Sequence, residues 1–138
     1  MTYLLDKSAW VVGGRQPEAA ARLAELARTG SLGMCTMAAL EVLYSARNAN
    51  EHRATLQQLT RFPWFELSDQ RAALELHHAL ALQGWHRTSL PDVLIACIAA
   101  EHRLTVLHYD SDYERLAEVA GIQHEWVIER GSGHSSPS

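Results

Sequence analysis

Two periodicities alternate along this chain: short apolar runs, and longer segments in which apolar residues recur every three or four positions. The short runs predict strands, and the longer segments predict helices. Strands are expected at residues 2–5, 32–35, 64–67, 104–109 and 122–128. Helices are expected at residues 17–30, 36–49, 51–62, 68–84, 90–103 and 111–121, with a short helix or turn at 8–12.

Hydroxyl residues and glycines mark several of the expected helix ends. Thr36 and Ser68 precede helical patterns, where a side-chain oxygen can accept a hydrogen bond from a free backbone N–H group. Gly30, Gly84 and Gly121 follow the patterns at their carboxyl ends. We therefore expect Thr36 and Ser68 to be N-caps and the three glycines to end their helices.

Strands that alternate with helices predict an α/β fold, in which a parallel sheet is covered on both faces. The chain has 138 residues, which suits one compact domain, expected at residues 1–130. Hydrophobic residues make up 47% of the chain and charged residues 20%, a balance that excludes a disordered protein. The final segment, GSGHSSPS at 131–138, is small and polar, so a disordered tail is expected there.

Membrane insertion and disulfide frameworks are not expected. The longest purely apolar run, residues 93–100, is too short to cross a bilayer. Asp6 and Lys7 interrupt the apolar N-terminal stretch, so it does not resemble a signal peptide. Cys35 and Cys97 lie in apolar runs without a CxxC pair, which predicts buried free thiols. These features favour a cytoplasmic protein.

Acidic residues lie directly beside the apolar runs. Asp6 follows the first strand, and Asp110 follows the strand at 104–109. Asp92 falls in the first turn of the helix at 90–103, and Glu41 falls in the second turn of the helix at 36–49. A helix that follows a parallel strand begins at the edge of the sheet where the strand finishes. We therefore expect these carboxylates to meet at one end of the domain.

A cluster of carboxylates predicts a site for a divalent cation. The acids repel one another unless some are protonated or a hard cation such as Mg²⁺ or Mn²⁺ binds between them. One or two such ions would activate a water for attack on a phosphodiester and stabilise the leaving oxygen. The net charge of −4 argues against a polyanionic partner, but a bound cation makes such a cluster locally electropositive. The chain contains no HExxH, GxGxxG or GxxxxGK[ST] motif that would indicate other chemistry.

Each candidate residue also has a purely structural interpretation. An aspartate at a helix N-terminus is often a capping partner, which applies to Asp92 and more strongly to Asp112. Glu41 needs a partner if it is buried, although a one-sided helix would point it to water. Ser8 would cap the following helix, or orient a ligand carboxylate by a hydrogen bond. His108, within a strand beside the acids, is expected to be structural.

Four motifs together carry a resemblance to a known family. The segments YLLDKSA, MAALEVLYSARNA, LPDVLIACIAA and LTVLHYDSDYERLAE resemble PIN-domain ribonucleases, and more narrowly VapC-type toxins of toxin–antitoxin pairs. The resemblance extends from about residue 3 to residue 128 and implies an α/β/α sandwich around a parallel sheet. The family's four acids, its hydroxyl residue and its auxiliary acid match Asp6, Glu41, Asp92, Asp110, Ser8 and Asp112, respectively.

This resemblance implies a metal-dependent endoribonuclease that cleaves RNA with Mg²⁺ or Mn²⁺. It further implies a homodimer that a cognate VapB-type antitoxin inhibits. Two positions depart from the family pattern: Lys7 lies between the first acid and the hydroxyl residue, and Tyr113 replaces a usual phenylalanine. Two rival hypotheses remain. One is an inactive PIN-like module that binds RNA or protein, and the other is a phosphotransferase with Asp6 as nucleophile, which would need an acid in place of Ser8.

Overall fold

A four-stranded parallel sheet lies at the centre of the computed structural model, which describes residues 1–132. The strand order is β2-β1-β3-β4, and each neighbouring pair is parallel, as expected. Residues 133–138 of the expected tail lie outside the described residues. The strands are β1 (Tyr3–Leu5), β2 (Leu32–Gly33), β3 (Thr105–His108) and β4 (Gln123–Trp126).

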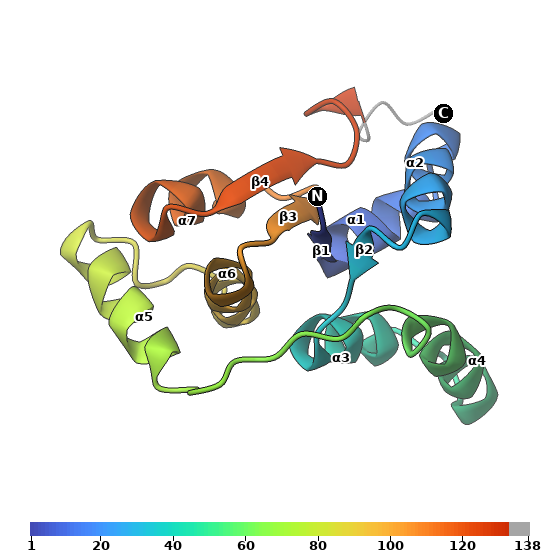
Figure 1. The fold of residues 1–138 in the computed structure, drawn as a ribbon, viewed down its shortest axis with the longest axis horizontal. Helices are drawn as coiled ribbons and strands as arrows, with labels where there is room; N and C mark the ends of the chain where they lie inside the picture. Colours follow the sequence, from blue (N-terminus) through green and yellow to red (C-terminus); the bar gives the residue numbers. More distant parts are fainter. Residues whose placement is uncertain (133–138) are drawn as a thin grey trace.

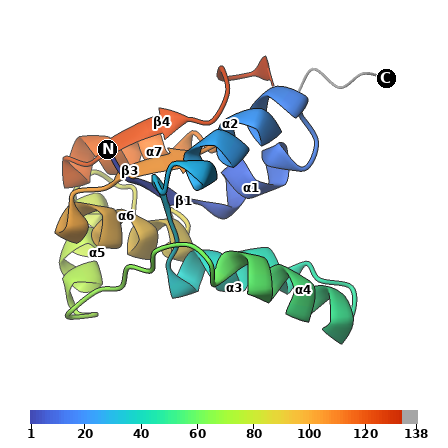
Figure 2. The ribbon, with the colours of Figure 1, turned by 45° about the vertical axis from the view of Figure 1, so that its right-hand side comes forward.

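Helices cover both faces of this sheet and make it the middle layer of an α/β/α sandwich. Figure 1 shows α1 and α2 on one side of the strands and α6 and α7 on the other, with α5 outside α6. A view turned by 45° shows α3 and α4 side by side beneath α1 and α2 (Figure 2). The helices are α1 (Lys7–Gly13), α2 (Pro17–Arg28), α3 (Thr36–Tyr44), α4 (Ala49–Leu59), α5 (Ala72–Leu82), α6 (Leu90–His102) and α7 (Asp112–Ala120).

The core lies between the sheet and its two helical layers. Leu4 and Leu5 of β1 and Val106 and Leu107 of β3 are fully buried, because these central strands have helices on both faces. Both faces of such strands must be apolar, which explains why their sequences are continuous apolar runs rather than alternating ones. Burial of one such side chain contributes about 1.5–3 kcal/mol. This rigid centre holds the carboxyl ends of β1 and β3 side by side.

The predicted strand at residues 64–67 is wrong. Within the described residues this segment forms one isolated bridge, between Trp64 and Met34, and the N–H of Phe65 donates to the carbonyl of Met34 at 2.8 Å. Pairing stops there because β2 ends at Gly33 and the chain then enters α3. Glu66 instead accepts hydrogen bonds from the backbone N–H and hydroxyl of Thr36, the first residue of α3.

The two expected N-caps are also wrong, because tertiary partners occupy both hydroxyl groups. Thr36 is the first residue within α3 rather than its cap, and its hydroxyl donates to Glu66. Ser68 lies before α5, which begins at Ala72, and its hydroxyl donates to Glu101 of α6 at 2.7 Å. An acid from elsewhere in the fold has replaced the local capping bond in each case.

The cysteines and the lengths of the helices bear on two further expectations. Cys35 and Cys97 are buried and free, as the apolar runs around them predicted. Among residues 1–132, no helix combines the length and the apolar character needed to cross a membrane.

Candidate metal centre

Asp6 lies at the point where β1 ends and α1 begins. Its backbone N–H donates to the carbonyl of Leu107 in β3 at 3.0 Å, which continues the β1–β3 pairing to this residue. The residue is 2% exposed, and its side chain caps α1 by accepting the N–H of Ser8 at 2.9 Å. The carboxylate is therefore fixed at the carboxyl edge of the two central strands.

Ser8 connects this carboxylate to β3. Its hydroxyl donates to Oδ2 of Asp6 and accepts the backbone N–H of Tyr109 at 2.8 Å. Of the two interpretations given to Ser8, the structure favours the one in which it orients a carboxylate. The N-cap of α1 is Asp6, not Ser8.

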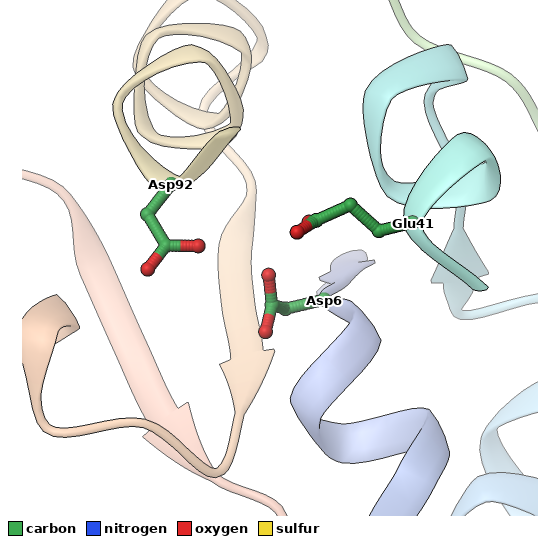
Figure 3. Close-up of side chains that lie close together, drawn as sticks. All are labelled: Asp6, Glu41 and Asp92. Atoms are coloured by element: carbon green, nitrogen blue, oxygen red, sulfur yellow. The ribbon is translucent and has the colours of Figure 1, made fainter. Parts of the chain in front are cut away.

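Glu41 and Asp92 reach the same place from two helices. Glu41 lies in the second turn of α3, and Asp92 lies in the first turn of α6 and is 5% exposed. In Figure 3 both side chains point toward Asp6. Oxygens of these three residues lie within 4.8 Å of one another. The structure thus brings together three acids that are far apart in the sequence.

Asp110 and Asp112 form a second group that shares Asp92 with the first. Oxygens of Asp92, Asp110 and Asp112 also lie within 4.8 Å of one another. The expected N-cap role of Asp112 is wrong, because Ser111 occupies that position and Asp112 is the first residue of α7. Its backbone N–H donates to Oδ1 of Asp110 at 2.9 Å, so the turn after β3 holds both acids beside α6.

Burial and mutual repulsion disfavour negative charge in this cluster. Burial is the largest cause that raises the pKa of Asp92 to about 8, and Asp6, Asp110, Glu41 and Asp112 add to it. Burial also raises the pKa of Asp6, although hydrogen bonds from Ser8 and Tyr113 oppose the rise. The pKa of Glu41 is raised by burial and by Asp6, and Lys7 acts in the opposite direction.

The donor set suits a hard divalent cation. Among the described residues, two buried side-chain oxygens lack a hydrogen-bond partner: Oε1 of Glu41 and Oδ2 of Asp92. A buried carboxylate oxygen without a donor is costly, and a positive ion beside it would remove that cost. Mg²⁺ and Mn²⁺ prefer oxygen ligands of this kind. The residues present therefore fit the predicted cation.

Tyr113 belongs to this centre, although the sequence suggested only a mild departure from a family pattern. Its hydroxyl donates to Oδ1 of Asp6 at 2.8 Å and lies 3.3 Å from Oδ1 of Asp92. An aromatic residue on a helix resembles any core position, and nothing local in the sequence marks its hydroxyl. Only the fold brings the two carboxylates to it.

His108 supports the turn that carries Asp110. Its Nδ1 accepts the backbone N–H of Asp110 at 3.0 Å, and its Nε2 lies 2.8 Å from Nδ1 of His124. An Nδ1 that accepts leaves the proton on Nε2, which then donates to His124. Burial, followed by His124, lowers the pKa of His108 to about 3. The expected structural role of this histidine agrees with these contacts.

Comparisons with known proteins relate this geometry to a family. The PIN domain family model matches residues 3–119. Ribonuclease VapC51 of Mycobacterium tuberculosis is 36% identical and covers 96% of this chain and 97% of its own length. Ribonuclease VapC17 of the same species is 41% identical and covers 86% of this chain and 89% of its own length.

Solved structures agree on the fold. A chain of VapBC2 from Rickettsia felis superposes with a TM-score of 0.74 at 18% identity, covering 91% of this chain and 98% of that chain. A chain of VapBC from Salmonella typhimurium gives a TM-score of 0.72 at 18% identity, and the match covers 93% of this chain and 99% of that chain. Together with the family match and the relatives above, this likeness leads to one conclusion: the chain belongs to the PIN domain family, in its VapC ribonuclease branch.

Proposed function

We propose that this protein is an endoribonuclease that depends on Mg²⁺ or Mn²⁺ and acts as the toxin of a toxin–antitoxin pair. The observation that carries the proposal is the pair of buried, unpartnered oxygens of Glu41 and Asp92, which lie beside Asp6. Such oxygens suit a cation better than a hydrogen-bonded protein core. The names of the VapC relatives support RNA as the substrate.

Each acid in the cluster has a proposed role. Asp6, Glu41, Asp92 and Asp110 would hold the cation, directly or through water. Ser8 would keep the carboxylate of Asp6 in place, and Asp112 would add negative charge beside Asp110. When bound, the cation supplies positive charge and Lewis acidity at the scissile phosphodiester, with water as the nucleophile.

Two protein partners complete the proposal. The similar solved structures are of VapBC, so we propose a VapB-type antitoxin that inhibits this chain. We also propose a homodimer. Support for it comes from Leu40 and Tyr44 of α3, which are large, apolar or aromatic, and exposed. Apolar surface of this kind tends to be covered by another protein.

The test uses purified protein free of antitoxin, incubated with total bacterial RNA in Mg²⁺, in Mn²⁺ and in EDTA. We expect discrete cleavage with either metal and none in EDTA. Asp92→Asn and Glu41→Gln are expected to reduce cleavage by at least about a hundredfold, since each removes a charged ligand from the centre.

Asp69→Asn is the matched control, because Asp69 is an exposed acid that pairs with Arg71 outside the cluster. This variant should cleave RNA at the wild-type rate. Full activity of folded Asp92→Asn would contradict the proposal. A wild-type protein that neither binds Mn²⁺ nor cleaves RNA would favour a module that only binds. A phosphate group trapped on Asp6 would instead indicate a phosphotransferase.

A further inference from the structure

The hydroxyl of Tyr113 lies between two carboxylates that come from different parts of the fold. Tyr113 is in α7 and is 0% exposed, whereas Asp6 follows β1 and Asp92 begins α6. The hydroxyl oxygen is 2.8 Å from Oδ1 of Asp6 and 3.3 Å from Oδ1 of Asp92. A buried phenol donor therefore bridges the two acids.

The bridge distinguishes the two oxygens of Asp92. Tyr113 contacts Oδ1 of Asp92, and Oδ2 has no hydrogen-bond partner among the described residues. In Asp6, Oδ1 accepts a hydrogen bond from the hydroxyl of Tyr113, and Oδ2 accepts one from the hydroxyl of Ser8. A donor on one oxygen fixes the rotation of a carboxylate about its terminal bond. Tyr113 thus sets the orientation of the Asp92 carboxylate and leaves its Oδ2 without a partner. This oxygen belongs to the same cluster as the unpartnered Oε1 of Glu41.

The ring of Tyr113 is itself held in place. It packs against His108, with ring centroids 4.8 Å apart, and His108 accepts the backbone N–H of Asp110 at 3.0 Å. A phenol whose ring is packed and whose hydroxyl is bonded has little freedom to move. Contacts from this one side chain therefore reach Asp6 and Asp92 directly, and Asp110 through His108.

We propose that Tyr113 is a positioning residue, whose hydroxyl holds Asp6 and Asp92 in the arrangement that binds the divalent cation. This inference rests on the proposed function. Two close carboxylates repel each other, and without a shared donor they would rotate or move apart. Outer hydrogen-bond partners of metal ligands commonly contribute about 10–100-fold to metal affinity. Tyr113 would supply such a contribution to two ligands at once.

Tyr113→Phe tests the proposal, because it keeps the packed ring and removes only the hydroxyl. Mn²⁺ binding is measured by calorimetry without RNA, after circular dichroism has checked the fold. We expect the dissociation constant to rise about tenfold or more. Cleavage at limiting Mn²⁺ should fall by a similar factor, recover at saturating Mn²⁺, and show an unchanged KM for RNA.

Tyr3→Phe is the matched control, since the Tyr3 hydroxyl also donates to a carboxylate, that of Glu125, at 3.1 Å and outside the cluster. It should bind Mn²⁺ as the wild type does. Wild-type affinity in Tyr113→Phe would overturn the inference, and so would a loss of cleavage that saturating Mn²⁺ does not restore. Failure of the wild type itself to bind Mn²⁺ would instead contradict the proposed function.

A second measurement covers the case in which Tyr113→Phe does not fold. Saturating Mn²⁺ should perturb the tyrosine ultraviolet difference spectrum of the wild type and of Tyr3→Phe, because the carboxylates that contact the buried phenol gain a cation. An unperturbed spectrum in protein that binds Mn²⁺ would contradict the inference.

Discussion

At Asp92, burial and repulsion from neighbouring acids act in the same direction. Burial, followed by four neighbouring acids, raises its pKa to about 8 from an ordinary value of 3.8. The folded, metal-free protein therefore binds a proton at Asp92 that the unfolded chain releases at a lower pH. Its stability must fall as the pH rises from about 4 to about 8, because over this range the folded state binds more protons.

Asp92→Asn should remove this loss of stability. Each pKa unit corresponds to about 1.4 kcal/mol, so we expect the metal-free variant to be more stable than wild type by about 2–4 kcal/mol at pH 8. The advantage should shrink as the pH falls toward 5. Urea unfolding of EDTA-treated proteins at several pH values measures it.

Saturating Mg²⁺ or Mn²⁺ should stabilise the wild type and have little effect on Asp92→Asn, since the ion binds the folded state. Asp69→Asn serves again as the control, because a hydrogen bond from Arg71 lowers the pKa of that exposed acid. Its difference from wild type should stay constant between pH 5 and pH 8. A constant difference for Asp92→Asn as well would contradict the account of Asp92.

At the scale of the element, the sequence predicted the long helices and the central strands better than the short connections. Runs such as residues 104–109 are apolar because they are buried on both faces, so local sequence and tertiary position agree. The segment at 64–67 is a short, mostly apolar run like those of the strands, but it pairs only at Met34, just after the end of β2. The N-caps predicted at Thr36 and Ser68 are wrong, because the hydroxyls of these residues donate hydrogen bonds to Glu66 and Glu101 instead.

The sequence predicted which acids lie in the candidate site, but it did not predict the hydrogen bonds that hold them. Asp6 and Asp110 follow strands, and that placement alone indicated which edge of the sheet they share. The shared donor at Tyr113 could not be predicted, because its partner oxygens lie 107 and 21 residues away in the sequence. Alternation of apolar and polar residues reports which face is buried and not which atoms meet there.

Gly33 ends β2, shortly before the helix that carries Glu41, and its surroundings leave no room for a side chain. A Cβ atom added at Gly33 would lie 2.6 Å and 2.9 Å from two ring atoms of Phe65 and 3.3 Å from the carbonyl oxygen of Tyr3. We expect Gly33→Ala to destabilise the protein by about 1–3 kcal/mol, the usual cost of an overpacked core. Thermal unfolding measures this difference.

Gly14→Ala is a suitable comparison, because a Cβ there would lie 3.4 Å from its nearest neighbour, the carbonyl oxygen of Val11. Gly14 ends α1 with φ −80°, which alanine adopts readily. Its melting temperature should remain close to that of wild type. Equal melting temperatures for the two variants would show that Phe65 moves aside without cost.

At the scale of the whole molecule, the exposed aromatic ring of Tyr44 is the feature that most suggests a protein partner. Its exposed fraction is 92%, and Leu40, one turn earlier on α3, is 55% exposed. Both lie on the helix that carries Glu41. A homodimer formed through this face would place the second copy beside the acidic cluster.

Tyr44→Glu should convert such a dimer to a monomer without unfolding it, since an exposed side chain makes little contribution to the core. Sedimentation velocity at several protein concentrations measures the change. Leu82→Glu on α5 is the control, because Leu82 is 73% exposed on another helix. A dimer that persists in Tyr44→Glu would place the interface elsewhere.

The order of the strands has a consequence for the synthesis of this chain. β1 is made first, yet it lies inside the sheet, where Tyr3 pairs with Thr105 of β3. Asp6 and Glu41 therefore emerge from the ribosome before Asp92 and Asp110, their neighbours in the folded cluster, have been made. Under the proposed function, an unfinished chain has no cutting centre. The proposed activity would therefore begin only after Asp110 has been made, so a growing chain would not cleave RNA beside its own ribosome.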